Sequence, residues 1–259
     1  MSALSGKWAL VTGATAGLGL AVAESLAAVG ANLVVHDLAA PCEVADSLTS
    51  RFGIDAIGVA ADLSQRTAIE AMMSDLLTRL GGIDILVNNA VVRHFALAED
   101  FSPEKWDEAL AVNLSAPFHL ARLALPAMKR RGFGRIINMG SIYSRRAVAE
   151  RIDYVTTKTA IIGMTRAIAI ETATANITCN ALCPGTLSTP AIQSKIATAA
   201  ASDGRSVDEA TRKYLAARQP SGRFVATEGV GAMTVFLCGA AAQDITGAAL
   251  PIDGGWSIA

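Results

Sequence analysis

The chain has 259 residues, of which 52% are hydrophobic and 17% are charged, and its formal net charge is −1. This balance suits a large buried core and gives no general attraction to nucleic acid or to an anionic membrane surface. The apolar runs are too short to span a bilayer, and the N-terminal residues show no signal-peptide pattern. The four cysteines lack the spacing of a metal site. We therefore expect a cytoplasmic protein without a bound metal.

Short apolar segments alternate with helical stretches along the chain. We predict strands at residues 8–12, 32–36, 56–60, 83–87, 135–139 and 178–182. We predict helices at residues 18–29, 66–80, 103–113 and 154–170. Buried strands that alternate with helices predict a doubly wound parallel α/β sheet with helices on both faces. We expect a single Rossmann-fold domain over residues 1–259.

One stretch near the C-terminal end is less regular than the rest. Residues 187–224 carry SKIATAAASDGRSVDEATRKYLAARQPSGRF, which indicates helices outside the strand and helix alternation. We predict a small helical insertion that covers the substrate. A plain surface excursion is the alternative interpretation.

A tyrosine and a lysine stand one helical turn apart. Tyr154 and Lys158 project from the same face of the predicted helix, so the ammonium lies beside the phenol. A free phenol has a pKa near ~10 and is a poor base at neutral pH, whereas a nearby cation favours phenolate. Tyr154 is then the candidate acid and base, and Lys158 its tuning charge. Ser141, upstream, is the candidate hydroxyl that orients a carbonyl or an alcohol.

A glycine-rich turn follows the first predicted strand. Gly13, Gly17 and Gly19 lie in the segment TGATAGLG, which opens the first helix. Glycine permits close approach of a pyrophosphate to the backbone and to the amides at the helix N-terminus. Many strand-to-helix turns contain glycine, so the position in the first strand–helix unit carries the prediction of a dinucleotide site.

An acidic residue ends the second predicted strand. The Asp37 carboxylate can accept hydrogen bonds from the hydroxyls of an adenosine ribose. It would also repel a 2′-phosphate, and no Arg or Lys follows nearby to offset that repulsion. This pattern favours NAD over NADP. A surface aspartate without a ligand is the alternative.

These motifs together resemble the short-chain dehydrogenase/reductase family from residue 7 to residue 256. The motifs are TGATAGLG, Asn-Asn-Ala after the fourth strand, VNLSAPF, Ser141, YVTTK and NALCPG, and their joint order is more specific than any one of them. One departure is Val91, which stands where the family usually has a glycine and adds bulk near the cofactor.

The resemblance implies a role for each matching position. It gives a catalytic set of Asn113, Ser141, Tyr154 and Lys158, in which Asn113 kinks a helix and holds a water of a proton relay. It implies that Asp62 contacts adenine, that Asn89 borders the ribose and that Thr189 holds the carboxamide. Lys158 would also bind the nicotinamide ribose. It further places at the cofactor Leu18, Leu63, Ala90, Tyr154, Pro184 and Gly185. The family also implies a homotetramer.

Within the family, the C-terminal two thirds of the chain are most similar to D-3-hydroxybutyrate dehydrogenases. The resemblance assigns substrate contacts to Arg93, Ser141, Tyr143, Arg151, Thr186, Lys195 and Trp256. Trp256 matches those enzymes. Where they carry glutamine, histidine, lysine, tryptophan and glutamine, this chain carries, in that order, Arg93, Tyr143, Arg151, Thr186 and Lys195.

These substitutions predict a different substrate. Thr186 in place of an indole enlarges the pocket and adds a hydroxyl. Arg93, Arg151 and Lys195 supply more positive charge than one carboxylate requires, and the arginine fork suits carboxylate, phosphate or sulfonate oxygens. We expect a sugar acid, a sulfonated sugar such as sulfoquinovose, or a hydroxy acid.

Four further basic side chains have weaker signals. Arg145 and Arg146 either add to this positive field or are solvated loop charges or subunit contacts. His94 and His119 have no motif around them, which favours surface or packing roles.

The main hypothesis is an NAD-dependent dehydrogenase that oxidises a secondary alcohol or hemiacetal of a small anionic, hydroxylated molecule. A second hypothesis keeps the mechanism and makes 3-hydroxybutyrate the substrate. A third is a sensor that binds NAD without turnover. A sensor has no reason to keep Asn113, Ser141, Tyr154 and Lys158 together at the spacing of a catalytic set. Ketone reduction driven by NADPH is a further alternative, which Asp37 disfavours.

Overall fold

Seven strands form one parallel sheet in residues 4–259, the part of the chain that the computed structural model describes. Their order is β3-β2-β1-β4-β5-β6-β7. The strands are β1 (Trp8–Thr12), β2 (Asn32–Asp37), β3 (Ala56–Ala60), β4 (Ile85–Asn88), β5 (Gly134–Met139), β6 (Ile177–Pro184) and β7 (Ala249–Ile252). Residues 1–3, part of the stretch without a signal-peptide pattern, lie outside the described residues.

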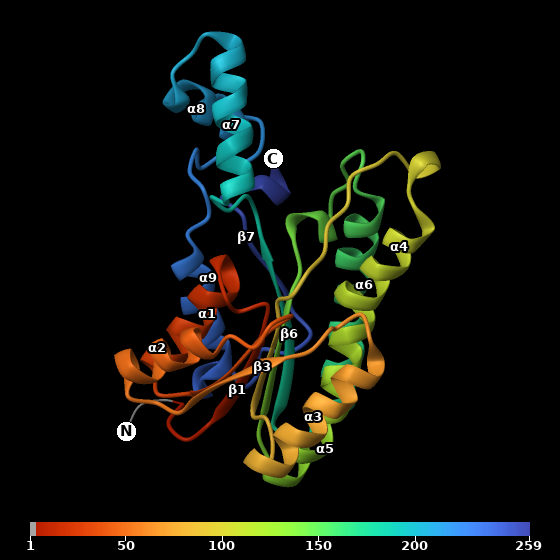
Figure 1. The fold of residues 1–259 in the computed structure, drawn as a ribbon, viewed down its shortest axis with the longest axis vertical. Coiled ribbons are helices and arrows are strands. Elements are labelled where there is room, and N and C mark those ends of the chain that lie inside the picture. Colours follow the sequence, from red (N-terminus) through yellow and green to blue (C-terminus); the bar gives the residue numbers. More distant parts are fainter. Residues whose placement is uncertain (1–3) are drawn as a thin grey trace.

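Helices cover both faces of the sheet (Figure 1). One face carries α1 (Gly17–Ala28), α2 (Cys42–Phe52) and α9 (Thr227–Cys238). The other carries α3 (Arg66–Leu80), α4 (Pro103–Leu110), α5 (Ala116–Arg131) and α6 (Ile152–Thr172). The predicted doubly wound, single-domain α/β fold is confirmed. None of the helices in the described part of the chain is long and apolar enough to cross a membrane.

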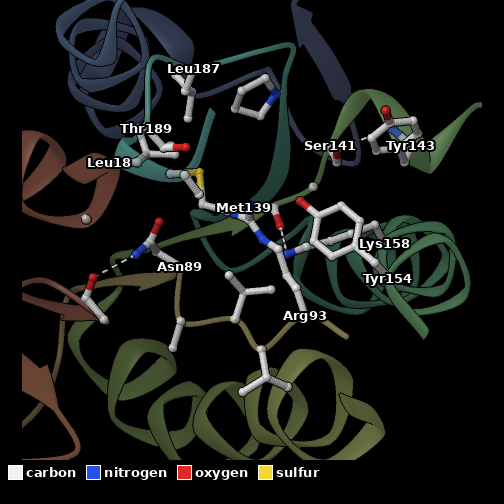
Figure 2. A pocket seen from close by; sticks show the side chains of 18 of the residues that line it. Leu18, Asn89, Arg93, Met139, Ser141, Tyr143, Tyr154, Lys158, Leu187 and Thr189 are labelled. Atoms are coloured by element: carbon white, nitrogen blue, oxygen red, sulfur yellow. Dashed lines mark hydrogen bonds between the residues drawn. The ribbon is translucent and has the colours of Figure 1, made fainter. Parts of the chain in front are cut away.

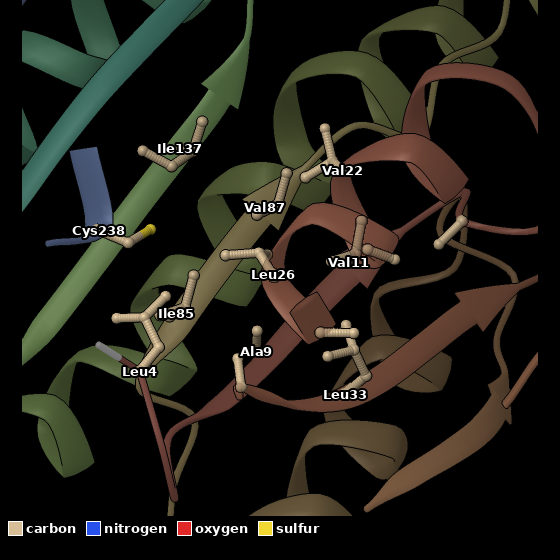
Figure 3. Close-up of a cluster of buried hydrophobic side chains, with 14 of the residues drawn as sticks. Leu4, Ala9, Val11, Val22, Leu26, Leu33, Ile85, Val87, Ile137 and Cys238 are labelled. Carbon is tan, nitrogen blue, oxygen red and sulfur yellow. The ribbon is translucent and has the colours of Figure 1, made fainter. Parts of the chain in front are cut away.

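Side chains that alternate along the strands build a core on each face. Val11 and Val87 pack with Leu26 of α1 on one face, and all three are fully buried (Figure 3). Leu10 and Val34 point to the opposite face and join the cluster beneath α3 and α5. Strands buried on both faces explain why the predicted strands read as nearly continuous apolar runs.

Several elements differ from the prediction. The predicted strand 83–87 begins two residues later, at Ile85. The predicted helix 103–113 ends at Leu110 and continues as a π-helical turn, Ala111–Ser115, into α5. The edge strand β7 is absent from the predicted strands. It contains Pro251, which lacks a backbone N–H and is tolerated at a sheet edge.

The strand order predicts a binding crevice beyond the carboxyl ends of the central strands. Chain order reverses on the two sides of β1, which pairs with both β2 and β4. Ligands of open parallel sheets bind beyond the carboxyl ends of the strands at such a switch point. The predicted polar residues therefore meet beyond the carboxyl ends of these strands.

Residues 187–224 leave the sheet and return to it at one place. Leu187 pairs with Val225, and the amide of Val225 donates to the Thr186 carbonyl at 2.9 Å. Between them, α7 (Pro190–Asp203) and α8 (Val207–Ala216) form a hairpin that projects beyond the sheet (Figure 1). Ile196, Ala200 and Ala210 give this hairpin a small core of its own. We call residues 187–224 the helical hairpin segment.

The first turn of α1 packs directly on the end of β1. A Cβ placed on Gly19 would lie 2.1 Å from the Gly13 carbonyl oxygen and 2.6 Å from Nδ2 of Asn89. Gly13 itself has a φ of +62°, a conformation that favours glycine. Only a residue without a side chain therefore lets this helix begin so close to the strand.

We expect Gly19→Ala to lower the free energy of unfolding by about 1–3 kcal/mol, because the new methyl group meets backbone that must shift. Gly163→Ala on α6 is the matched control. A Cβ there meets nothing within 4 Å, and alanine at an open helical site stabilises by up to about 1 kcal/mol. Urea unfolding of the two variants measures both effects, and equal stabilities would show that the turn is not tightly packed.

Candidate active site

A cavity of about 700 Å³ follows the carboxyl ends of the strands from the start of α1 to the helical hairpin segment. Nearly every predicted site residue lines it. The predicted residues in the lining are Gly13, Leu18, Gly19, Asp37, Asp62, Leu63, Asn89, Ala90, Arg93, Ser141, Tyr143, Arg151, Tyr154, Lys158, Pro184, Gly185, Thr186, Thr189, Lys195 and Trp256. Gly17 and Asn113 are outside the lining. The fold thus gathers residues from widely separated segments around one space.

Asn89 braces the glycine-rich turn. Its Nδ2 donates to the carbonyl oxygens of Thr12 and Gly13, each at 2.9 Å. The Thr12 hydroxyl in turn accepts from the amides of Asn89 at 2.9 Å and Ala90 at 3.0 Å. Thr12 is not among the predicted site residues, although it belongs to the TGATAGLG motif. These bonds hold the turn close to the β4 loop.

The far end of the cavity is acidic. Asp37 accepts from the amide of Leu38 at 2.8 Å and from the hydroxyl of Thr15. Thr15 is not among the predicted site residues. Asp62 accepts from the amide of Ser64 at 2.9 Å. The neighbouring His36 is buried, and burial lowers its pKa, so this imidazole adds little positive charge. Both carboxylates line the cavity and can accept hydrogen bonds from a ligand.

Lys158 lies one turn after Tyr154 on α6, as predicted, and its amine is almost completely buried (Figure 2). Its Nζ donates to the Met139 carbonyl at 2.5 Å and lies 5.7 Å from the centroid of the Tyr154 ring. Burial, together with the nearby Arg93 charge, lowers the pKa of Lys158 to about 7. The ammonium predicted from the sequence is therefore only partly populated near neutral pH until an anion or a polar ligand adds support.

Ser141 is held at the carboxyl end of β5. Its Oγ accepts from the amide of Tyr143 at 3.2 Å, and its own amide donates to Ser144 Oγ at 3.1 Å. These bonds fix the first residues of a short 3₁₀ turn, Ile142–Ser144. The Ser141 hydroxyl faces the same cavity as Tyr154, with its proton free to be donated.

Asn113 lies in the π-helical turn and points toward the loop after β4. Its Oδ1 accepts from the Val92 amide at 2.9 Å, and its Nδ2 donates to the Val92 carbonyl at 3.0 Å. The side chain also reaches Thr157 Oγ1 of α6 at 3.4 Å. The structure thus shows a clamp between helix and loop, and the proton relay implied by the family resemblance stays a prediction.

A buried carboxylate, absent from the predicted site, lies next to the tyrosine. Asp153 has no exposed surface, and it accepts from the amide of Tyr154 at 2.6 Å and from that of His94 at 3.1 Å. It therefore joins the start of α6 to the loop that carries Arg93. An acidic residue in the first turn of a helix is favoured by the helix dipole, which is the only signal the sequence gives.

A row of aromatic rings leads from Tyr154 to the C-terminal segment. The rings of Tyr154 and Tyr143 lie 6.2 Å apart, and those of Tyr143 and Trp256 lie 5.8 Å apart. Burial raises the pKa of Tyr143, so this phenol stays protonated and can donate a hydrogen bond. Asp253 accepts from the amide of Ser257 at 2.8 Å and so orders the segment around Trp256.

Basic side chains surround the same end of the cavity. The guanidinium carbons of Arg93 and Arg151 lie 5.3 Å and 5.9 Å from the Tyr154 ring centroid. Burial and the Arg93 charge lower the pKa of Arg151. Lys195 reaches the cavity from α7, and Arg218, which the sequence analysis did not single out, reaches it from the residues after α8. The cavity is therefore basic at one end and acidic at the other.

Thr186 lines the cavity, and its amide donates to the side chain of Gln219. Gln219 is buried and also donates to the Arg223 carbonyl, so it ties the two ends of the helical hairpin segment together. Gln219 was not among the predicted residues. The backbone of Thr186 is therefore held in place by Gln219. Its side chain is the smaller one predicted from the sequence, where similar enzymes carry tryptophan.

The remaining basic residues singled out in the sequence do not line the cavity. Arg145 donates to the Ala249 carbonyl at 3.1 Å, and Arg146 donates to that of Trp256 at 2.6 Å. Both arginines thus hold the C-terminal segment. His94 Nε2 lies 3.2 Å from a Glu108 carboxylate oxygen, and the His119 ring lies 5.2 Å from that of Phe118.

Titration of Lys158 has a measurable consequence for stability. An unfolded lysine has a pKa near ~10.4, so between about pH 7 and pH 10 the unfolded chain binds more protons than the folded one. We expect the free energy of unfolding to rise over this range, by up to about 1.4 kcal/mol per pH unit from this group. Lys158→Met should lack that rise.

Denaturant unfolding at several pH values between 7 and 10, without added ligand, measures the difference. Lys129→Met removes an exposed lysine and is the control, which should keep the wild-type pH dependence. Parallel curves for the wild type and Lys158→Met would contradict the depressed pKa.

Comparisons with known proteins agree with this geometry. A family model described as enoyl-(acyl carrier protein) reductase matches residues 13–257. The chain is 44% identical over 257 residues to a D-beta-hydroxybutyrate dehydrogenase of Cupriavidus necator, covering 98% of each chain. It is 38% identical over 254 residues to a dehydrogenase of the same name from Rhizobium meliloti, covering 97% of this chain and 98% of that one.

A solved structure shows the same likeness in three dimensions. The L-sorbose reductase of Gluconobacter frateurii, complexed with NADPH and L-sorbose, superimposes with a TM-score of 0.93 at 30% identity, over 100% of both chains. These matches, together with the cavity and its tyrosine, lysine and serine, show that the chain is an oxidoreductase of the short-chain dehydrogenase/reductase family.

Proposed function

We propose that the protein is an NAD-dependent dehydrogenase that oxidises a secondary alcohol or hemiacetal hydroxyl of a small anionic, hydroxylated substrate. The observation that carries this proposal is the cavity itself. Tyr154, Lys158 and Ser141 line its middle, cationic side chains line one end, and Asp37 lines the other. A dinucleotide and an anionic alcohol can therefore meet at the tyrosine.

The residues present fit a nicotinamide dinucleotide. The start of α1 has no side-chain cap, so its amides are free to donate hydrogen bonds to the oxygens of a pyrophosphate, and Gly19 leaves room for close approach. Asp37 and Asp62 would hold the adenosine. Thr189 Oγ1 accepts from the Ile192 amide at 3.4 Å, which leaves its own proton for a carboxamide. When bound, the cofactor supplies the hydride acceptor.

The chain's own residues perform the proton chemistry. Tyr154 Oη accepts the proton of the substrate hydroxyl, while Ser141 Oγ donates a hydrogen bond to the same oxygen. Lys158 gains positive charge when its Nζ binds the ribose hydroxyls and an anionic phenolate forms beside it. Tyr143 and Trp256 position the substrate, and the cations hold its acidic part.

Asp37 is the basis for preferring NAD. Among the cavity-lining residues of the described chain, no Arg or Lys lies at the adenosine end; the basic ones all belong to the tyrosine end. A 2′-phosphate would thus meet a carboxylate and no compensating cation. The sorbose reductase structure holds NADPH, so the choice of cofactor must be measured for this chain.

The alternative substrate is 3-hydroxybutyrate itself, which the identity to two D-beta-hydroxybutyrate dehydrogenases favours. Replacement of the usual pocket residues by Arg93, Thr186 and Lys195 disfavours it. Steady-state assays with 3-hydroxybutyrate, sugar acids and sulfonated sugars separate the two. A kcat/KM that strongly favours hydroxybutyrate would discard the larger, more anionic substrate.

The other expectations have less support. A sensor that binds NAD without turnover leaves the buried Lys158 and its neighbours without a purpose, and NADH formation from any alcohol would dispose of it.

The homotetramer is supported by apolar side chains left exposed on helices, such as Phe118, Ile170 and Phe236. It and the cytoplasmic location stay predictions from the sequence.

We expect Tyr154→Phe to lower kcat by about 10²–10⁴-fold, because the proton acceptor is lost while the ring remains. NAD affinity, measured by ligand titration, should change little. Tyr143→Phe is the comparison, and its loss should appear mainly in KM. Near-normal turnover by Tyr154→Phe would refute the mechanism.

We expect Asp37→Ala to lower the NAD/NADP ratio of affinities by about tenfold or more, since it removes both an acceptor for the ribose and the repulsion of a phosphate. Asp62→Ala is the control, because its loss should weaken both cofactors alike. Titration of each variant with NAD and NADP measures the ratio. An unchanged ratio in Asp37→Ala would show that another group selects the cofactor.

A further inference from the structure

Four basic side chains surround the substrate end of the cavity. They are Arg93 from the loop after β4, Arg151 at the start of α6, Lys195 on α7 and Arg218 after α8. Within residues 4–259, none of the four forms an ion pair with a carboxylate. Buried Asp153 acts on one of them, Arg151, so only part of the positive charge at this end is compensated within the described chain.

The cavity has few acids with which to balance this charge. Asp37 and Asp62 lie at the adenosine end, and Glu108 is already within 3.2 Å of His94. A phenolate at Tyr154 would offset one charge at most. The whole chain carries a formal net charge of −1, so the excess is a local property of this end of the cavity.

The four cations come from two parts of the fold, the body of the protein and the helical hairpin segment. Arg93 and Arg151 belong to the body of the protein and lie within 6 Å of the Tyr154 ring centroid, at 5.3 Å and 5.9 Å. Figure 2 shows Arg93 extending into the cavity toward Tyr154 and Lys158. An acidic group bound by this pair would lie next to the hydroxyl that reacts.

The second pair belongs to the helical hairpin segment. Lys195 projects from α7, and Arg218 follows α8, where its guanidinium carbon lies 3.9 Å from the Tyr214 ring centroid. One Arg218 nitrogen donates to the Tyr214 carbonyl at 2.9 Å, which holds the side chain and leaves its other N–H groups for a ligand. The Arg218 charge acts on Tyr143, which places Arg218 near the middle of the aromatic row, and Lys195 lines the same cavity.

We infer, on the basis of the proposed function, that the substrate carries two acidic groups: one held by Arg93 and Arg151 beside the reacting hydroxyl, and one held by Lys195 and Arg218. The substrate class is then a dianionic hydroxy compound, namely a hydroxy dicarboxylate or a hydroxy acid that also bears a sulfonate or phosphate. Arg218 is a specificity-determining residue for the second group. A sugar acid with one carboxylate would occupy only the first pair.

Binding of non-reacting acids tests the charge requirement separately from the chemistry. Isothermal titration, with and without saturating NAD, compares succinate, glutarate and adipate, each with its own monomethyl ester. Each ester matches its diacid in chain length and lacks one charge. We expect at least one diacid to bind about tenfold or more tightly than its ester, the gain of one charge-assisted contact.

Variants at Arg218 test whether this residue is responsible for the tighter binding of the diacid. Arg218→Met should abolish the preference for the diacid, whereas Arg218→Lys should keep part of it because the charge remains. Arg212→Met removes an exposed charge from α8 outside the cavity lining and should leave the preference intact. Thermal unfolding of each variant shows whether the hairpin is still folded.

Three results would overturn the inference: no diacid binds, every diacid binds no better than its ester, or Arg218→Met keeps the full preference while folded. Turnover separates this failure from failure of the proposed function. NADH formation from a singly charged hydroxy acid, without any preference for diacids, would remove only the second acidic group. Tight diacid binding without NADH formation from 3-hydroxybutyrate, a sugar acid, a sulfonated sugar or a hydroxy dicarboxylate would instead remove the dehydrogenase.

Discussion

The Nζ of Lys158 donates to the Met139 carbonyl at the end of β5, and this buried contact joins the proposed catalytic residues of α6 to the strand that leads to Ser141. It fixes α6 against the carboxyl edge of the sheet, so Tyr154, one turn earlier, faces the cavity. Ser141 follows Met139 by two residues and is placed by the same strand. Burial disfavours the positive charge on the Lys158 amine and lowers its pKa. A bound ligand that offers hydrogen-bond acceptors or negative charge to this amine would favour the charged form again.

The cavity is electrically polar along its length, and this polarity orients what binds there. Carboxylates at the end beyond β2 can accept from ribose hydroxyls, whereas arginines and lysines gather beyond the tyrosine. Under the proposed function, a dinucleotide and an anionic alcohol would bind at opposite ends and meet at Tyr154. Asp153 supports the arrangement, because it joins the catalytic helix to the loop that carries Arg93.

Much of this structure follows from local sequence. Fully buried strands read as apolar runs, and the i, i+4 spacing of Tyr154 and Lys158 places both on one helix face. Elements that depend on tertiary packing were harder to predict. The edge strand β7 contains Pro251, which hides it from the apolar pattern. The family resemblance implied a helix kink at Asn113, but the π-helical turn and the bonds of Asn113 to Val92 follow from no local pattern.

The candidate site shows the same division. Motif residues could be predicted because their order along the chain is specific. Thr15 and Asp153 were missed because each has a partner that is distant in sequence, Asp37 and His94 respectively. Arg218 was missed because only the folded hairpin brings it to the cavity. Lys158 was located correctly, yet the effect of burial on its charge depends on the closed surroundings of the folded chain. The sequence therefore indicates the residues of the candidate site, whereas the protonation state of Lys158 depends on how the folded chain buries it.

The most direct test is a crystal structure of the protein with NAD and a bound hydroxy acid. We expect the nicotinamide ring beside Tyr154, the phenol oxygen within hydrogen-bond distance of the substrate hydroxyl, and Lys158 Nζ within hydrogen-bond distance of the ribose. A dinucleotide bound elsewhere, or a Tyr154 hydroxyl turned away from the ring and the substrate, would contradict this expectation.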